Sequence, residues 1–180
     1  QDLGVFSFIK DHFPKLPLHA STQISAYGHH GFSLLGQMGF DRAVLPRELS
    51  LSQITKIHDN CDINLECFIH GALCFCYSGQ CMMSSMIGGR SANRGTCAQS
   101  CRKQYGIYEN GKKTAKGYPL SPKDLCAVKT INSLIEIGVT SFKIEGRMKT
   151  ALYVATVART YRKAIDDYIQ SPEVYQKNLD

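Results

Sequence analysis

The sequence contains 180 residues, of which 43% are hydrophobic, and carries a formal net charge of +6. This length and composition provide one domain, or part of a larger one, with enough apolar side chains for a buried core. No run of roughly 18 apolar residues occurs, which excludes a membrane-spanning helix. The mild positive charge permits a polyanionic partner such as RNA without requiring one.

The start of the chain, residues 1–13, has the pattern of an amphipathic helix and lacks the basic beginning and apolar centre of a signal peptide. Because it begins inside this pattern without Met, we expect the chain to be a fragment of a longer protein. It contains eight cysteines, six of which lie between Cys61 and Cys97. Disulfide frameworks belong to small secreted domains that cannot build a core. We therefore expect reduced thiols and a cytoplasmic location.

Strand and helix signals alternate along the rest of the sequence. The expected strands cover residues 16–21, 42–46, 63–70 and 139–146, with one more short strand ending in residues 117–121. The expected helices cover residues 27–39, 50–60, 121–138 and 150–169.

Several helix ends carry capping signals. Gly39 is expected to stop the first of these helices. Ser50, with Gln53 three residues later, forms a capping box, and Ser121 followed by Pro122 has the pattern of another helix start. The last helix is expected to bury one apolar face, made of Leu152, Ala155, Ala158, Tyr161, Ile165 and Tyr168.

The alternation predicts an α/β fold with a parallel sheet covered by helices. One interval, residues 71–118, is much longer than a single helix needs, and within it Asn110-Gly111 predicts a type I′ β-hairpin. An insertion at the carboxyl end of a parallel strand lies where a TIM-like (β/α)8 barrel builds its active site. About five βα units are visible, so a barrel would have its first three strands upstream of Gln1. We expect residues 1–170 to form this partial barrel and residues 171–180 to be a tail or the start of a linker.

Four cysteines of the long interval have ligand-like spacing. Cys74, Cys81, Cys97 and Cys101 follow the pattern C-x6-C-x15-C-x3-C in a segment rich in Gly and Ser. Four thiolates can close a tetrahedral site for zinc or hold an iron–sulfur cluster. The alternative is that they are buried free thiols. Cys76 is either a substitute ligand or only a neighbour.

Of the other cysteines, Cys61 ends an expected helix, Cys67 lies in an expected strand and Cys126 lies in an expected helix. They are better explained by packing in the core.

Polar residues at the expected strand ends are further candidates for a site. Lys143, Glu145 and Arg147 would share one face of the last strand, where they could bind an anionic substrate or form only a structural ion-pair network. Glu48 follows the second strand. His70 ends the third and could act as a site residue or as a structural histidine.

The segment Glu66–Arg102 ("ECFIHGALCFCYSGQCMMSSMIGGRSANRGTCAQSCR") closely resembles the signature region of the peptidase U32 family, the collagenase-like protease group. The shorter motifs "HASTQ", "LPRELSL", "LSPKDL" and "SFKIEGRMK" resemble the same family, and the resemblance extends from Asp2 to about Ile169. Within the family, the chain is most similar to the bacterial proteins that hydroxylate tRNA uridine to 5-hydroxyuridine.

The resemblance implies a TIM-like barrel with an iron–sulfur cluster, of the 4Fe–4S type, on the same four cysteines. It also implies oxygen-independent hydroxylation of the wobble uridine of tRNA, with prephenate, a small dicarboxylate, as the hydroxyl donor. An anionic donor would suit the cationic residues at the strand ends. The alternative functions are a peptidase that hydrolyses peptide bonds, as the family name suggests, and an RNA-binding module in which the thiolate site is only structural.

Overall fold

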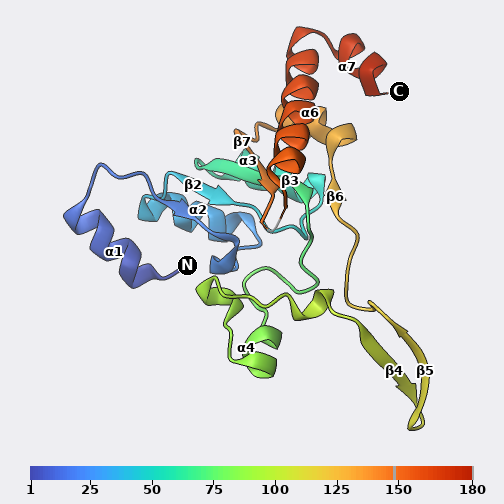
Figure 1. Cartoon of the computed structure of the whole chain (residues 1–180). Coiled ribbons are helices and arrows are strands. Elements are labelled where there is room, and N and C mark those ends of the chain that lie inside the picture. Colours follow the sequence, from blue (N-terminus) through green and yellow to red (C-terminus); the bar gives the residue numbers. More distant parts are fainter. Residues whose placement is uncertain (148, 180) are drawn as a thin grey trace.

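The computed structural model describes residues 1–147 and 149–179. A parallel sheet organises the molecule (Figure 1). Its parallel strands are β1 (His19–Ala20), β2 (Arg42–Val44), β3 (Asn64–Gly71) and β7 (Ser141–Glu145), paired in that order. The fifth strand, β6 (Leu125–Cys126), is antiparallel to β3. At His70 and Gly71, β7 pairs with one edge of β3 and β6 pairs with the other. Strand β6 therefore lies on the same edge of β3 as β2, which pairs with residues 64–66.

Helices cover one face of this sheet and complete the core. They are α2 (His29–Met38), α3 (Leu51–Asn60), α5 (Ile131–Ile137) and α6 (Ala151–Gln170). Their apolar side chains pack in one cluster with Leu65 and Ile69 of β3. Alternation along β3 turns Glu66 and Phe68 to the opposite face. The expected α/β class with a parallel sheet is therefore confirmed, and the arrangement is compatible with part of an α/β barrel.

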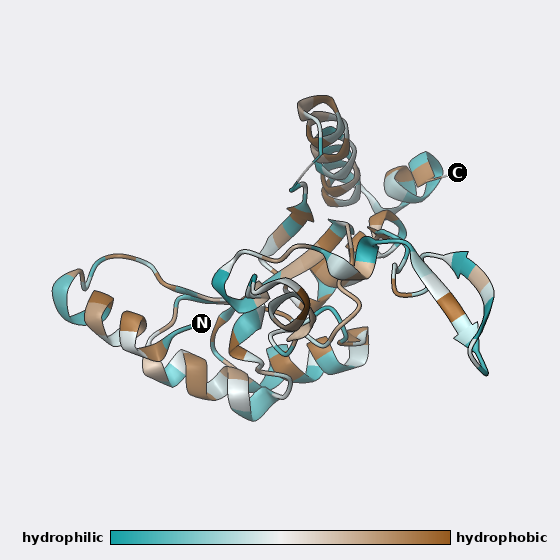
Figure 2. Cartoon of the chain, turned by 60° about the horizontal axis from the view of Figure 1, so that its bottom comes forward, coloured by the Kyte–Doolittle hydropathy of each residue, from teal (hydrophilic) through white to brown (hydrophobic). Residues whose placement is uncertain are grey.

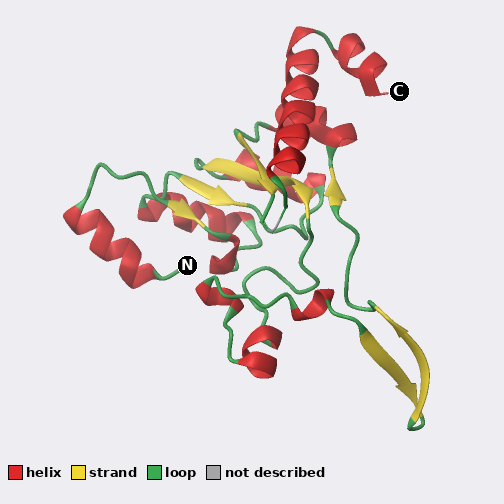
Figure 3. Ribbon diagram, in the orientation of Figure 1, coloured by secondary structure: helices red, strands yellow, loops and turns green. Residues whose placement is uncertain are grey.

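The remaining elements lie outside this layered body. Helix α1 (Leu3–His12) precedes β1, and the short helix α4 (Met83–Gly88) lies in the segment between β3 and β6. That segment is mostly loop, and β4 (Tyr105–Glu109) and β5 (Lys112–Gly117) project from it as a hairpin (Figure 3). No helix of the described residues is both long and apolar enough to cross a membrane.

Several local predictions are confirmed. Gly39 ends α2 with a positive φ of 94°. Ser50 and Gln53 form the complete capping box of α3. Asn110 and Gly111 have positive φ values of 49° and 76°, as a type I′ hairpin turn requires.

Residues 117–126 were predicted wrongly. Residues 117–121 add no parallel strand to the sheet, and Ser121 does not begin a helix. The hydroxyl of Ser121 accepts a hydrogen bond from Arg102 instead. Four residues later, Leu125 and Cys126 pair with β3 as β6. The helical region begins only at Val128–Thr130, a 3-10 turn that leads into α5. Cys126, expected in a helix, lies in β6 and is exposed.

Two predictions near the C-terminus also need correction. Leu152, Ala155 and Ala158 of α6 are exposed rather than buried, and the buried positions of the helix are Tyr161 and Ala164. Residues 172–179, expected to be a tail, form helix α7 (Pro172–Leu179), which packs beside α6 and buries Tyr175. Asp180 lies outside the described residues.

Candidate functional site

The four cysteines selected by spacing line one cavity. Cys74, Cys81, Cys97 and Cys101 surround a space of about 190 Å³, and Cys76 lines it as well. Phe75, Met82 and Met83 contribute apolar walls. All eight cysteines of the chain are free thiols. The structure therefore brings five thiols together within one short stretch of chain.

The thiols in this cavity influence one another electrostatically. Burial raises the pKa of Cys101, and the neighbouring Cys74 and Cys97 add to this effect. Burial likewise raises the pKa of Cys76, with Cys81 and Cys74 as the next contributors. A cation or a cluster bearing positive charge would relieve this mutual repulsion, because a metal-bound thiol is deprotonated.

The size and chemistry of the cavity suit a group larger than one metal ion. A water molecule has a share of about 30 Å³ of liquid volume, so about 190 Å³ exceeds the space of a single ion. The backbone N–H of Gln99 donates to Cys97 Sγ at 3.3 Å, the kind of contact that tunes a sulfur ligand. Among residues 1–147 and 149–179, no three His, Cys, Asp or Glu side chains form a group arranged for a metal ion.

The cysteine-bearing segment is attached to the loop that follows β1. The carbonyl oxygen of Ser78 accepts hydrogen bonds from Tyr27 Oη at 2.6 Å and from Ser25 Oγ at 3.1 Å. Gln23 donates from its side-chain amide to the carbonyl oxygen of Ala92 at 3.1 Å. These contacts hold the segment at the carboxyl end of β1.

Glu48, a predicted site residue, also anchors this segment. Its carboxylate accepts hydrogen bonds from Ser78 N–H at 2.6 Å and from Ser78 Oγ at 3.1 Å. Ser78 is completely buried, so this carboxylate satisfies two polar groups that water cannot reach. Both carboxylate oxygens are engaged in positioning the loop between Cys76 and Cys81.

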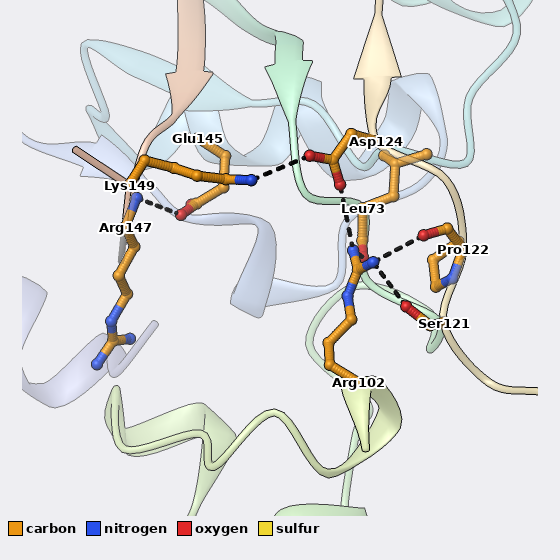
Figure 4. Close-up of polar contacts among 8 residues, drawn as sticks. All are labelled: Leu73, Arg102, Ser121, Pro122, Asp124, Glu145, Arg147 and Lys149. Atoms are coloured by element: carbon orange, nitrogen blue, oxygen red, sulfur yellow. Dashed lines mark hydrogen bonds and ion pairs between the residues drawn. The ribbon is translucent and has the colours of Figure 1, made fainter. Parts of the chain in front are cut away.

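Arg102 closes the long segment at its base (Figure 4). Its guanidinium donates to the carbonyl oxygen of Leu73 at 2.6 Å, just after β3, and to that of Pro122 at 2.7 Å, just before β6. A third hydrogen bond, of 2.9 Å, reaches Ser121 Oγ. Arg102 thus joins both ends of the segment beside Cys101.

The three charged residues predicted on the last strand do not form a common network. Lys143 Nζ lies 3.0 Å from Glu66 Oε1. Glu145 accepts a hydrogen bond from the backbone N–H of Arg147 at 2.8 Å (Figure 4). Arg147 lies beyond the end of β7, and its guanidinium donates to the carbonyl oxygen of Gly95 at 3.2 Å. Lys143 and Glu145 therefore share the face of β7 that lies opposite the core-packed Phe142 and Ile144, as expected. Arg147 does not share it and contacts the cysteine-bearing segment.

Glu66 was missed by the sequence analysis. Its side chain is only 12% exposed and contacts Lys143, Ser141 Oγ at 2.9 Å and Arg42 at 3.8 Å. Burial by itself would raise its pKa, but these hydrogen bonds and charges outweigh burial and lower it. An acid inside a strand rich in apolar residues was the available signal. On the sheet face opposite the helices, Glu66 holds together polar side chains from three neighbouring strands.

His70 lies outside the cysteine cavity. Its Nδ1 is 3.3 Å from Tyr161 Oη, and its ring also lies near that of Tyr153, with centroids 5.9 Å apart. The Tyr161 hydroxyl in turn donates to the carbonyl oxygen of Ile69 and accepts from Ala127 N–H. His70 thus contacts the residues that join β3, β6 and α6. Cys61 and Cys67 pack against the core, as expected, and burial raises the pKa of Cys67 to about 11.

A second cavity adjoins the cysteines. It has a volume of about 380 Å³. Its lining consists of Arg47, Glu48, Leu73, Cys74, Phe75, Cys76 and Tyr77. Arg47 Nε is buried and has no hydrogen-bond acceptor within the described part of the chain. The guanidinium carbon lies 5.5 Å from the centroid of the Phe68 ring, and Lys143 Nζ lies 5.3 Å from the same centroid. Two cations therefore flank one aromatic ring.

Comparison with known proteins identifies the family. A model of peptidase family U32 matches residues 1–180. The chain belongs to this family. This confirms the resemblance carried by the sequence motifs.

Curated members of the U32 family differ in the activities that their names describe. The chain is 42% identical to tRNA hydroxylation protein P1 of Bacillus subtilis (strain 168) over 168 residues, covering 89% of this chain and 40% of that protein. It is 42% identical to the 23S rRNA 5-hydroxycytidine C2501 synthase of Escherichia coli (strain K12) over 172 residues, covering 94% and 26%. It is 36% identical to a collagenase of Porphyromonas gingivalis over 166 residues, covering 84% and 40%.

The chain thus spans less than half the length of these relatives. No solved structure matches it.

Proposed function

We propose that this chain is part of an iron–sulfur enzyme of the U32 family that hydroxylates RNA. The specific reaction we propose is oxygen-independent conversion of the tRNA wobble uridine to 5-hydroxyuridine, with prephenate as the hydroxyl donor. The observation that carries the proposal is the convergence of Cys74, Cys81, Cys97 and Cys101 on one cavity at the strand ends. The RNA-hydroxylating names of two relatives support the substrate class.

In this proposal the four cysteines hold a 4Fe–4S cluster, with Cys76 as a fifth thiol beside it. Replacing a C–H bond of uridine by C–OH removes two electrons from the base, and the hydroxyl donor would take them up as its own C–OH bond is replaced by C–H. A cluster held by these cysteines would supply the redox centre that mediates this exchange. Arg102 holds Cys101 in place, and Glu48 positions the loop that carries Cys76 and Cys81. Zinc on the same thiolates is the alternative, in a structural role.

The second cavity is suited to the anionic co-substrate. Arg47 Nε is buried without a hydrogen-bond acceptor in the described part of the chain, which costs free energy because the N–H group has lost its contacts with water. A carboxylate is the natural partner of a guanidinium, because the two groups match in charge and geometry. Lys143 lies near the same Phe68 ring but pairs with Glu66 and does not line this cavity, so the proposed contact with a carboxylate rests on Arg47. We infer that residues 1–170 contribute this site as part of a TIM-like barrel whose other strands belong to the longer protein.

The decisive experiment is nucleoside analysis of tRNA from cells that lack the gene. We expect 5-hydroxyuridine derivatives to disappear and to return with the wild-type gene but not with Cys97→Ser. The protein purified anaerobically should be brown and contain iron and sulfide, and Cys101→Ala should lose this colour. Unchanged 5-hydroxyuridine derivatives would refute the proposed reaction, and a colourless protein with one bound zinc would refute the cluster.

The collagenase relative supports one competing function, peptide-bond hydrolysis. In the described residues, the side-chain hydrogen bond of His70 goes to the Tyr161 hydroxyl rather than to a cysteine or serine. Gelatin cleavage by the purified protein that survives removal of iron, and is abolished by a single nucleophile substitution, would favour the peptidase over the hydroxylase.

A further inference from the structure

The hairpin formed by β4 and β5 extends away from the rest of the molecule (Figure 1). Nearly all of its residues are exposed, and it is mostly hydrophilic (Figure 2). A two-stranded hairpin without a packed face is only marginally stable in water. Because neither face of this hairpin packs against the rest of the molecule, both faces are accessible to a binding partner.

The two faces of the hairpin differ in chemistry. The pairing register places Tyr108 opposite Lys113, and Gly106 opposite Lys116. Alternation along β4 puts these four residues on one face, which we call the Tyr108 face. The opposite face carries Ile107 together with Glu109, which is paired with Lys112.

The geometry around Gly106 supports this assignment. A Cβ atom built on Gly106 would lie 2.9 Å from Cε2 of Tyr108 and 3.5 Å from Cε of Lys113. The tyrosine ring therefore lies across the glycine, with a lysine stem beside it. Because Gly106 has no side chain, the ring has room to lie over the strand, and Tyr108 remains 65% exposed.

Positive charge dominates the hairpin. Between residues 105 and 117 there are three lysines and one acid, Glu109, so the formal charge is 3 − 1 = +2. No lysine of the hairpin takes part in the ion pairs of the described residues. On the Tyr108 face, Lys113 and Lys116 have no acid opposite them, whereas Lys112 is paired with Glu109.

We propose that the Tyr108 face binds the RNA substrate, with an unpaired base stacked on Tyr108 and the flanking phosphates contacted by Lys113 and Lys116. This inference rests on the proposed function and names the surface that holds its substrate. Aromatic side chains interleaved with cations are the usual means of holding single-stranded nucleic acid. Lysine is depleted from protein–protein interfaces, which disfavours a protein partner.

The position of the hairpin connects this surface to the cysteine cavity. Strand β4 begins three residues after Arg102, and Tyr105 Oη donates to the carbonyl oxygen of Ser100 at 2.8 Å. Ser100 and Cys101 both line the cavity. An RNA loop held along the hairpin would thus be anchored close to the cysteines.

The test compares matched substitutions on the two faces. Binding of an unmodified tRNA transcript by the anaerobically purified protein is measured by fluorescence anisotropy at several KCl concentrations. Loss of one stacked base should raise the Kd roughly 5- to 150-fold in Tyr108→Ala. Tyr108→Phe should retain binding, and Ile107→Ala on the opposite face should change the Kd less than about twofold.

Charge on the two faces is compared in the same way. Lys113→Gln should reduce the slope of log Kd against log salt by about 0.7, the value for one phosphate contact on a single strand. Lys112→Gln removes the same charge from the opposite face and should leave the slope unchanged. Circular dichroism of each variant establishes that the fold is retained.

Equal effects from the two faces, or no effect from either, would overturn the inference. So would failure of the parent protein to bind the transcript. If the protein hydroxylates tRNA and the variants Tyr108→Ala and Lys113→Gln bind tRNA normally, this inference is wrong and the proposed reaction stands. If the variants lose tRNA binding but the parent protein hydroxylates no RNA, the proposed reaction is wrong and the inference about the hairpin stands.

Discussion

Glu48 offers a direct test of whether a strand-end carboxylate is catalytic or supports the cysteine-bearing loop. Glu48→Ala removes two hydrogen bonds and leaves the N–H and hydroxyl of the buried Ser78 without acceptors. Hydrogen bonds to a charged group are each worth about 1.5–3 kcal/mol, which gives about 3–6 kcal/mol for two. Glu48 is itself exposed and can be replaced in part by water, so we expect a loss of about 2–4 kcal/mol. For a domain of this size, the Tm would then fall by roughly 4–16 °C.

Glu48→Gln is the matched control. The amide oxygen can accept from Ser78 N–H, and the amide nitrogen can donate to Ser78 Oγ, so both contacts survive without the charge. We expect its Tm within about 4 °C of the parent, with normal iron content. Thermal unfolding, iron content and hydroxylation activity are measured for both variants. If both variants lose activity while keeping the parental Tm and iron content, Glu48 is catalytic and the supporting role is wrong.

Three further predictions concern the contacts around the sheet. Arg102→Lys cannot reproduce the three-way contact with Leu73, Ser121 and Pro122, so iron content after anaerobic purification should fall severalfold; full retention would contradict the role of Arg102 as a clamp. The pKa of Glu66 is lowered from 4.5, so its stabilising effect is present above that pH and lost as pH falls through the folded-state pKa. The stability of Glu66→Gln should therefore fall less than that of the parent between pH 6 and about pH 3, as measured by urea unfolding. Tyr161→Phe removes the hydroxyl's hydrogen bonds with Ala127 N–H and with the carbonyl oxygen of Ile69, which keep only their mutual hydrogen bond of 2.9 Å. At about 0.5–1.5 kcal/mol for each lost bond, the variant should lose about 1–3 kcal/mol of unfolding free energy, and an unchanged urea midpoint would contradict this.

Local chemistry made some parts of the fold predictable. The capping box at Ser50, the stop at Gly39 and the Asn110-Gly111 turn each depend on neighbouring residues alone. Ser121 shows the limit of such signals. Its sequence context is that of a helix start, but Arg102, 19 residues earlier, takes the hydroxyl that would have capped the helix. A contact between distant residues cannot be seen in a local pattern.

The same limit applies to α6. Its periodicity correctly predicts a helix, but the apolar stripe extends beyond the part that meets the core. Tyr161 and Ala164 are buried, whereas Leu152, one end of the expected face, is 77% exposed. Periodicity describes the side chains of one helix, and burial depends on how far its neighbours reach.

For the candidate site, spacing correctly selected cysteines that line one cavity, because Cys74, Cys81, Cys97 and Cys101 belong to one segment and can meet without a contact from a distant part of the chain. Glu66 could not be chosen in this way. Its partners Arg42 and Lys143 come from strands on either side of β3, so their proximity is set by sheet register.

The attachment of the cysteine-bearing segment leaves its side chains available for the proposed cluster. The body of the protein mainly holds the backbone of this segment: the carbonyl oxygens of Ser78, Ala92 and Gly95 accept from residues that follow β1 and β7. Backbone contacts leave the cysteine side chains free to line the cavity. Because these donors come from the ends of different parallel strands, the position of the segment depends on the whole sheet edge.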